Sequence, residues 1–490
     1  MAIAVKSEPI AAITKVMVNN LFLPNISDHL PERIERLPMT RVFYIIGIAA
    51  AVGYFFDIFD INTISAVAPA LEKIFSMNST YITITLSMGF IGMAIGSILS
   101  GRWSDIFGRK RLFTITLVIA AIGSLLTAIA TNVYELWIFR LITGFGIGGD
   151  LPVIWAYMSE MIPSRLRGRF FGFAMVIGVL SVPATTYAAA YFLSLSLFDW
   201  RYVFVLGAVI ALAIYPIRLI APESPRWYLA KGNLSAAEES IDSLEKKVKV
   251  EYGKELPAYN SATSYLINEV KFPVKELFNK KYRKSTTVAS LAWIFQTWAF
   301  YGYGAFLPLI LVAKGFSIVT SVEYAAIGFT GGFLGPLLVS FIGDRWQRKY
   351  QLILYGAVAG IGALALGLST LASEVIISAF IVALAEQAWA TMLYAYVPEI
   401  FPTDARSSGG GFANALGRGF NVIGLFVIGV ALAGSSLAQL SFVAVSWFAS
   451  AIVILVAGVL TTNMVLEDID KDEKFHSETS KSTEATVKKS

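Results

Sequence analysis

The sequence places six ionisable side chains inside long runs of apolar residues. They are Asp57, Asp60, Arg140, Asp150, Glu386 and Arg418. If those runs cross a membrane, each charge near the bilayer centre costs about 2.5–3.5 kcal/mol on insertion scales, so a retained charge usually has a function. These residue types allow proton transfer and anion binding, and the six positions are the first candidates for a functional site.

The three aspartates predict proton coupling. Asp57 and Asp60 lie three residues apart and so share one helix face, and Asp150 lies about halfway along another apolar run. Acids gathered around one buried cavity influence each other's ionisation, which suits the binding and release of a proton. Neither of the two histidines lies in an apolar run, so the carrier would be a carboxylate. The alternative is that Arg140 neutralises one of the acids in a structural ion pair.

Arg418 predicts an anion site because it lies in the middle of the apolar run 410–433. Its guanidinium stays protonated and presents a planar fork of donors that matches a carboxylate or a phosphate. The alternative is a salt bridge to Glu386, which lies at a similar depth in the preceding run. Both can hold if a substrate competes with Glu386 for the arginine.

The aromatic-rich stretch "WIFQTWAFYG" at 293–302 predicts further residues around a substrate. Aromatic side chains provide apolar walls with hydrogen-bonding tips, although about half of them are expected to face lipid or the membrane interface. Besides Arg418, the predicted substrate-binding residues are Trp293, Gln296, Tyr301, Glu386, Gln387 and Asn414. Asn421 and the amides in this set also keep a neutral, sugar-like substrate possible.

The composition is that of a membrane protein. The chain has 490 residues, of which 56% are hydrophobic and 15% charged, whereas soluble domains carry about 25% charged residues. It has no cysteine, which excludes disulfides, thiolate zinc sites and cysteine nucleophiles. No nucleophile–base set, metal-binding cluster or phosphate-binding loop is evident, so we expect neither an enzyme nor a cofactor. The net charge of +5 is spread over loops and tail and does not indicate a nucleic-acid partner.

Twelve apolar runs are long enough to cross a bilayer core of about 30 Å, which takes roughly 20 residues per helix. We expect an all-α membrane protein with spans at 42–66, 81–100, 112–131, 135–160, 170–193, 202–221, 287–312, 322–342, 351–371, 375–397, 410–433 and 437–462. The chain then divides into an N-terminal segment (1–41), a six-helix half (42–221), a linker with an amphipathic helix (222–286), a second six-helix half (287–462) and a disordered tail (463–490).

Loop charges predict the orientation in the membrane. Lysine and arginine gather in the loops after spans two, four, eight and ten, whereas the loops after odd-numbered spans hold only Lys73, Arg201 and Lys314. Because positive loops stay in the cytosol, both termini are predicted to be cytosolic. The first 40 residues mix polar and apolar types and show no signal peptide.

The charged stretch "GRWSDIFGRKR" at 101–111 has a second copy, "GDRWQRKY" at 343–350, and a constant offset of 239 residues relates them. The same offset relates "SEMIPSRLRGR" at 159–169 to "PEIFPTDARSS" at 398–408. It pairs Asp105 with Asp344, Arg109 with Arg348, Glu160 with Glu399 and Arg167 with Arg406, and it also pairs Asp57 with Gln296. Two six-helix halves repeated in parallel mark one large class of transporters.

These motifs resemble those of the major facilitator superfamily over essentially the whole chain. "GRWSDIFGRKR" is similar to the family's motif between helices two and three, "RLITGFGIGG" at 140–149 to its helix-four motif, and "PESPRWYLAKG" at 222–232 to an element of sugar porters and their relatives. The resemblance implies a gating role, holding the cytosolic face shut in one state, for Asp105, Arg109, Arg140, Glu160, Arg167, Asp344, Arg348, Glu399 and Arg406.

A finer resemblance is to proton symporters of small metabolites. "FFDIFD" at 55–60 is similar to an Asp-x-x-Asp element of phosphate and aromatic-acid symporters, "GGDLP" at 148–152 to a phosphate-symporter motif, and "LGRGFNVIG" at 416–424 to the Gly-Arg of aromatic-acid symporters. Thr297 and Arg418 stand where phosphate symporters carry an acid and a lysine, which disfavours phosphate.

The sequence therefore predicts a proton-coupled symporter of a small organic anion that works by rocking two halves around a midplane site. The expected partners are a small-molecule substrate, protons and the lipid bilayer of the cell membrane, and the chain is expected to be monomeric. A sugar or polyol porter is the alternative. A phosphate symporter and a transporter-like nutrient sensor are less favoured, the sensor because the tail is too short for a signalling domain.

Overall fold

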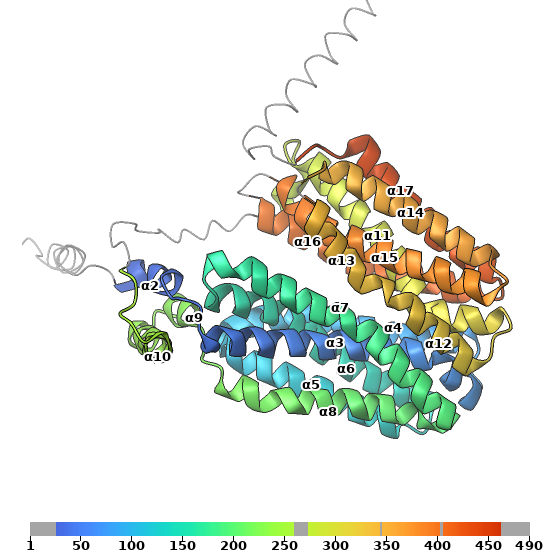
Figure 1. The fold of residues 1–490 in the computed structure, drawn as a ribbon, viewed down its shortest axis with the longest axis horizontal. Coiled ribbons are helices and arrows are strands. Elements are labelled where there is room, and N and C mark those ends of the chain that lie inside the picture. Colours follow the sequence, from blue (N-terminus) through green and yellow to red (C-terminus); the bar gives the residue numbers. More distant parts are fainter. Residues whose placement is uncertain (1–25, 259–272, 344, 402–404, 462–490) are drawn as a thin grey trace, which may run out of the picture.

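The computed structural model describes residues 26–258, 273–343, 345–401 and 405–461, and Figure 1 shows their fold. All regular structure in these ranges is helical. Asp344, the first 25 residues and the tail predicted to be disordered lie outside the described residues. The described part contains twelve spans that are long and apolar enough to cross a membrane, which confirms the predicted all-α architecture.

Most spans extend beyond their predicted bounds, because helical hydrogen bonding continues where polar residues replace apolar ones. The first six spans are α3 (Arg41–Ile74), α4 (Ser79–Phe107), α5 (Arg109–Ile129), α6 (Val133–Met161), α7 (Ser164–Leu195) and α8 (Trp200–Ile220). The last six are α11 (Arg283–Ala313), α12 with α13 (Ile318–Phe329, Gly331–Ile342), α14 (Arg348–Leu368), α15 (Ala372–Glu399), α16 with η3 (Arg406–Phe426, Val427–Ala431) and α17 (Ser436–Ala457). The shorter helices are α2 (Ile26–Glu35), η1 (Leu197–Asp199), α9 (Pro225–Ala230), α10 (Leu234–Tyr252) and η2 (Val274–Phe278).

The spans form two bundles whose internal contacts repeat. In the N-terminal half α3 packs on α7, α4 on α6, and α5 on both α6 and α8. In the C-terminal half the helices 239 residues later make the same pairs, since α11 packs on α16, α13 on α15, and α14 on both α15 and α17. The parallel repeat found in the sequence is therefore a repeat of packing.

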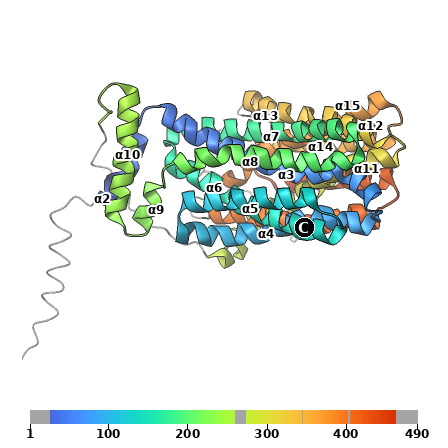
Figure 2. The same ribbon diagram turned by 90° about the horizontal axis from the view of Figure 1, so that it is seen from below.

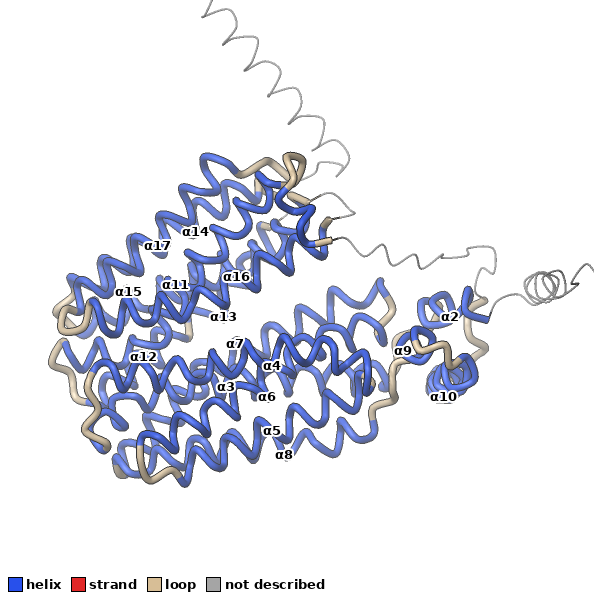
Figure 3. Tube along the Cα trace, turned by 180° about the vertical axis from the view of Figure 1, so that it is seen from behind, coloured by secondary structure: helices blue, strands red, loops and turns tan. Residues whose placement is uncertain are grey.

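The two halves meet mainly toward one end of the molecule. Figures 1 and 3 show the bundles touching near α12 and diverging toward α9 and α10, which lie with α2 beyond the other end of the spans (Figure 2). We call these the α12 end and the α10 end. Between the halves, α12 packs on α7, α11 on α3, and α16 with η3 on α4.

The stretch "GRWSDIFGRKR" was predicted to be a loop, and this is wrong. α4 runs through Phe107 and α5 begins at Arg109, so that only Gly108 separates the helices. Gly108 has φ 102°, a left-handed conformation that glycine adopts without strain. The Glu223 carboxylate accepts a hydrogen bond from the Lys110 backbone N–H at 3.0 Å and so caps the start of α5. A tight turn stabilised from another segment replaces the expected loop.

Two spans are less regular than predicted. The span expected at 322–342 divides into α12 and α13 around Thr330. Pro336, one turn into α13, lacks the N–H that would bond back toward this break. The span expected at 410–433 ends in a π-helix, η3, of the kind often found at functional positions.

An ionic cluster fixes α2 on the linker helix α10. The Arg33 guanidinium donates to Glu245 at 2.7 Å and to Asp242 at 2.5 Å. Burial alone would raise the pKa of Glu245, but the hydrogen bonds from Arg33 and Arg36 lower it. The apolar face of α10 is buried in a hydrophobic core that it shares with α2 and with residues of α3, α6 and α7. α2 and α10 therefore form one unit on the N-terminal half.

Gly429 of η3 makes a close approach between the halves at the α12 end. A Cβ added there would lie 2.0 Å from the Thr83 hydroxyl oxygen of α4 and 2.7 Å from the Phe306 ring. Only a residue without a side chain allows η3 to lie this close to α4.

Gly429→Ala is therefore expected to separate the halves at the α12 end. The wild type has no cysteine, so a thiol introduced by Ala433→Cys, at an exposed position nearby, reports on this end alone. We expect it to react with a soluble thiol reagent several-fold faster in the Gly429→Ala background. Gly304→Ala is the matched control, since a Cβ at Gly304 meets no atom within 4 Å. Equal labelling rates in both backgrounds would contradict the prediction.

Candidate functional site

Asp60 is neutralised by a buried arginine. Its carboxylate accepts from the Arg140 guanidinium at 2.6 Å and from the Ser124 hydroxyl at 2.7 Å, and all three side chains are buried. The guanidinium also lies over the Phe204 ring, 5.6 Å from its centroid. The alternative considered for Arg140, a structural pair with one of the acids, is what the structure contains.

Asp150 has a partner that the sequence analysis missed. The guanidinium of Arg218, on α8, donates to both carboxylate oxygens of Asp150, at 2.9 and 2.7 Å. The Thr116 hydroxyl donates to the same carboxylate at 2.9 Å. Arg218 also donates to the Phe113 carbonyl. Gly53 of α3 leaves room for the guanidinium, since a Cβ at this position would lie 2.1 Å from Nη2. The signal of Arg218 in the sequence was a charge near the end of the run 202–221, a position that resembles a loop charge.

Asp57 differs from the other two aspartates because its carboxylate has no partner. The side chain is fully buried, and neither oxygen has a hydrogen bond within the described part of the chain. It lies within electrostatic range of Asp60, Asp150 and Arg218. Burial of an unpaired ionised carboxylate is far more costly than burial of the neutral acid, so this position suits a group that binds a proton.

The charged pairs have no counterpart in the C-terminal half. The offset of 239 leads from the two ion pairs to uncharged residues, namely Ala299, Ala379, Trp389 and Ala457. Asp57 corresponds to Gln296, which is also buried and whose Oε1 has no hydrogen-bond partner among the described residues. The repeat therefore preserves the packing, whereas the three buried aspartates all lie in the N-terminal half.

Arg418 faces tyrosines rather than an acid. Its Nε donates to the Asn414 side-chain oxygen at 2.9 Å, and its guanidinium interacts electrostatically with the hydroxyl groups of Tyr301, Tyr394 and Tyr54. No ion pair joins it to Glu386, so that alternative is wrong. Glu386, on α15, is buried and interacts with Tyr303 instead. Glu386 and Arg418, which lies on α16, therefore have different neighbours.

The other predicted substrate-binding residues lie near this arginine or along the same face between the halves. Tyr301 packs against Phe90 of the N-terminal half, with ring centroids 4.7 Å apart. Trp293 is buried and packs edge-on against Tyr394 at 5.0 Å. Gln387 is half-buried beside Gly332. The sequence analysis did not predict Tyr54 or Tyr394, since a tyrosine in an apolar run gives no charge signal.

Asn421 and Glu386 add unpaired polar atoms to the C-terminal half. Asn421 is 1% exposed, and neither atom of its amide has a partner in the described ranges. Oε2 of Glu386 is likewise buried without a hydrogen bond there. Buried polar groups are normally satisfied, so these atoms are available to a ligand or to water.

One ion pair between predicted gating residues occurs in both halves at positions that the repeat relates, Arg109 with Glu160 and Arg348 with Glu399. Arg109 donates to Asp105 at 2.7 Å and to Glu160 at 3.1 Å, and Arg348 donates to Glu399. Arg167 donates to Glu35 at 3.3 Å, and Arg406, which begins α16, is half-buried. Every ion pair between described residues lies within one half or its attached cluster.

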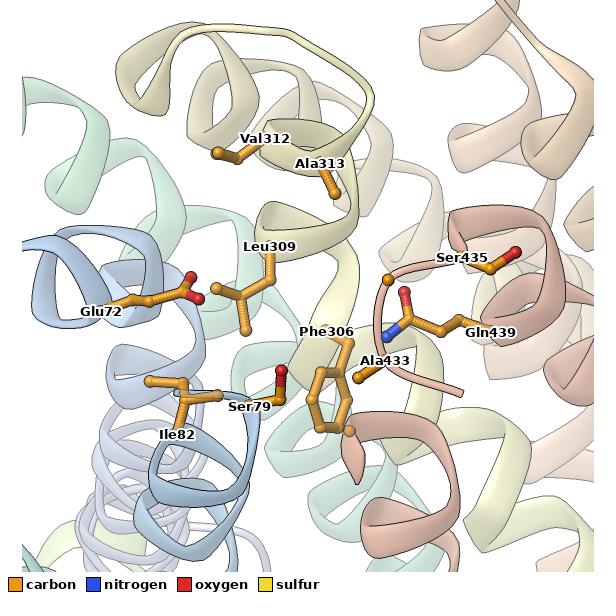
Figure 4. Close-up of a pocket in the computed structure, with 12 residues that line it drawn as sticks. Glu72, Ser79, Ile82, Phe306, Leu309, Val312, Ala313, Ala433, Ser435 and Gln439 are labelled. Atoms are coloured by element: carbon orange, nitrogen blue, oxygen red, sulfur yellow. The ribbon is translucent and has the colours of Figure 1, made fainter. Parts of the chain in front are cut away.

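A separate cavity lies between the halves at the α12 end (Figure 4). Its volume is about 220 Å³, and its lining comes from both halves, with the Glu72 carboxylate on one side and the Gln439 amide and Ser435 hydroxyl on the other. None of the predicted site residues lines it. The cavity therefore belongs to the contact between the halves rather than to the Arg418 site.

Twelve spans in two related bundles, with charged groups buried among the helices, define a multi-pass membrane transporter rather than an enzyme. The family described as "Major Facilitator Superfamily" matches residues 50–425, and the chain belongs to this superfamily.

Relatives from bacteria share this architecture. The chain is 33% identical to the "Putative metabolite transport protein YyaJ" of Bacillus subtilis (strain 168), over 87% of this chain and 94% of that protein. It is 29% identical to the "Niacin transporter NiaP" of Acinetobacter baylyi, over 90% of this chain and 99% of that one. Among solved structures, the inward open xylose transporter XylE from E. coli has a TM-score of 0.68 at 19% identity, covering 88% of this chain and 99% of XylE. At this identity the last likeness concerns the fold.

Proposed function

We propose that the protein is a proton-coupled symporter of a small organic anion, which it moves by alternating access as the two halves rock around a site between them. The observation that carries this proposal is Arg418. It is half-buried, and within the described residues no carboxylate lies at ion-pairing distance from it. A cation held inside a membrane normally pairs with an anionic group, and a substrate carboxylate would supply one.

The surroundings of Arg418 favour a carboxylate attached to a flat or apolar body. Tyr301, Tyr394 and Trp293 place aromatic rings with hydrogen-bonding tips near the guanidinium. The relative described as a niacin transporter supports this class, because niacin combines an aromatic ring with a carboxylate. Asn414 and Tyr394 hydrogen-bond the guanidinium, and the substrate carboxylate would accept from the donors that these two residues do not use.

Asp57, Asp60 and Asp150 remain the proposed proton-coupling group, and their partners rank Asp57 first. Asp60 and Asp150 are each held by an arginine, whereas Asp57 is unpaired within the described residues. A proton arriving at Asp57 therefore displaces no ion pair.

The proposed orientation places both termini and the α10 end in the cytosol, in the cell membrane, with a single chain as the working unit. Its support is the excess of arginine and lysine near that end. The ion pairs of Arg109 and Arg348 would then act on the cytosolic faces of the two halves.

A neutral sugar or polyol is the second candidate substrate, and specific atoms favour it. Gln296 and Asn421 are buried amides with unpaired atoms in the described structure, and amides suit hydroxyl groups.

Uptake by purified protein in lipid vesicles tests the proposal. We would compare nicotinate, benzoate, xylose and glucose with and without an inward pH gradient. Accumulation of a carboxylate that requires the gradient is the expected result. Uptake of a sugar without uptake of either carboxylate would overturn the anion assignment, and carboxylate uptake that ignores the gradient would overturn the coupling.

Arg418→Lys is expected to weaken substrate binding about tenfold or more, because lysine keeps the charge but loses the fork that pairs two donors with a carboxylate. The KM for the transported carboxylate measures the effect, and the melting temperature of the purified variant checks the fold. Lys314→Arg, a substitution outside the spans, serves as the control. Normal carboxylate transport by Arg418→Gln would contradict the proposed role.

A further inference from the structure

Tyr54 of α3 interacts electrostatically with Asp57 and with Arg418, one residue from each of the two sites described above. It precedes Asp57 by three residues, so both side chains lie on one face of the helix. The residue is half-buried and belongs to the N-terminal half.

Two contacts fix the ring of Tyr54. Trp155 of α6 packs edge-on against it, with ring centroids 5.1 Å apart. On α7, a Cβ added to Gly178 would lie 2.2 Å from two carbons of the ring. The ring therefore lies directly against the α7 backbone, where only glycine leaves room for it, and the hydroxyl is held in a defined place.

The hydroxyl of Tyr54 interacts electrostatically with residues of both halves. From the C-terminal half it interacts electrostatically with Tyr394 of α15, Arg418 of α16 and Tyr301 of α11. From its own helix it interacts with Asp57, which in turn faces Asp60, Asp150 of α6 and Arg218 of α8. Asp150 and Arg218, two of these neighbours, form an ion pair with each other. Asp57 is therefore the acid whose charge can change without breaking an ion pair.

We propose that Tyr54 is a positioning residue that couples the proton site to the anion site, an inference that rests on the proposed function. A phenol has a single donor hydrogen. When Asp57 is ionised, its carboxylate competes with a substrate carboxylate at Arg418 for that hydrogen. When Asp57 carries a proton, the competition ends and the Tyr54 hydroxyl donates to the substrate. Proton and anion then bind cooperatively, and each strengthens the other by the same factor.

Tyr54→Phe tests this inference because it removes the hydroxyl and keeps the ring against Trp155 and Gly178. We would measure the KM for nicotinate, or for the carboxylate of the panel that is transported, across a range of pH. In the wild type the KM should rise as Asp57 loses its proton. In Tyr54→Phe the KM at low pH should be about tenfold higher, and its dependence on pH should be much flatter.

Tyr44→Phe is the matched control. Tyr44 lies on the same helix, packs edge-on against Phe170 at 5.9 Å and is 50% exposed, so its hydroxyl faces neither site. Gly178→Ala provides a second test that leaves the hydroxyl in the chain, because the added methyl group must displace the ring. It should raise the KM and flatten the pH dependence in the wild type, and have a much smaller effect when combined with Tyr54→Phe.

The outcomes separate the inference from the proposed function. A wild-type protein that shows no pH-driven carboxylate uptake rejects the proposed function itself. A wild type that shows such uptake, with a Tyr54→Phe variant whose KM responds to pH as in the wild type, rejects the coupling role of Tyr54 alone. An equal loss of pH response in Tyr44→Phe would also overturn it, since the effect would then not be specific to the site.

Discussion

A protein in which Arg218 is replaced by glutamine is expected to unfold at a markedly lower temperature than the wild type. The substitution leaves the buried Asp150 carboxylate with Thr116 as its hydrogen-bond donor and no cation beside it. Removing one partner of a buried ion pair destabilises proteins by about 3–5 kcal/mol, mainly because the remaining charge is uncompensated. Thermal unfolding of the purified protein in detergent measures the loss.

The double variant Asp150→Asn with Arg218→Gln tests why Arg218→Gln loses stability. The cause is either the loss of the attraction within the ion pair or the uncompensated charge that remains on Asp150. The double variant removes both charges together, so it should recover much of the stability that Arg218→Gln loses. Arg111→Gln, at an exposed position in the same half, should melt with the wild type. A melting temperature for Arg218→Gln equal to that of the wild type would show that the pair adds nothing to the fold.

The ion pair between Asp150 and Arg218 also affects which of the three buried aspartates can carry the proton. A proton on Asp150 would deprive Arg218 of the two short contacts that now neutralise it, and the guanidinium cannot release its own proton. Asp60 faces the same difficulty because Arg140 would be left unpaired. Protonation of Asp57 breaks no contact between described residues, so the energetic barrier to loading it is the smallest of the three.

Hydrophobicity predicted the spans well because the bilayer imposes one requirement on all of them, a helix of about 20 apolar residues. The repeat predicted the shared packing for a related reason, since two copies of one pattern fold the same way. Hydropathy does not distinguish an α-helix from a π-helix, however, so η3 and the break at Thr330 were not predictable from it. The turn at Gly108 depends on Glu223, a residue far away in the sequence.

The candidate site was predictable in its residue types and not in its pairing. Asp57, Asp60 and Asp150 were visible as charges in apolar runs, yet which of them is unpaired depends on how α3, α5, α6 and α8 pack. Arg218 was not predicted as a site residue, because a charge near the end of an apolar run resembles a charge in a loop. Glu386 was predicted as an alternative partner of Arg418 because the two residues lie at a similar depth in the membrane. In the structure Arg418 bonds to Asn414 and Glu386 interacts with Tyr303, and depth alone does not predict such partners.

Asparagine at position 57 is expected to abolish pH-driven accumulation while sparing substrate exchange. The neutral amide mimics the protonated acid, so the loaded carrier can still bind substrate and reorient. It cannot release a proton, so it cannot return empty to start a new cycle of net uptake. In vesicles, accumulation driven by a pH gradient should fall to the level of protein-free vesicles, while exchange of labelled for unlabelled substrate stays near the wild-type rate.

Controls for this prediction follow from the partners of the acids. Asp57→Glu keeps a titratable carboxyl and should retain coupling. Asp60→Asn is not a neutral comparison, because it leaves Arg140 as a buried cation without its acid and should lower stability as well as transport. Full pH-driven accumulation in Asp57→Asn would reject the role of Asp57 as the carrier. Loss of exchange together with accumulation, in a variant that still melts normally, would instead assign Asp57 to substrate binding, because a carrier locked in the protonated form must still exchange.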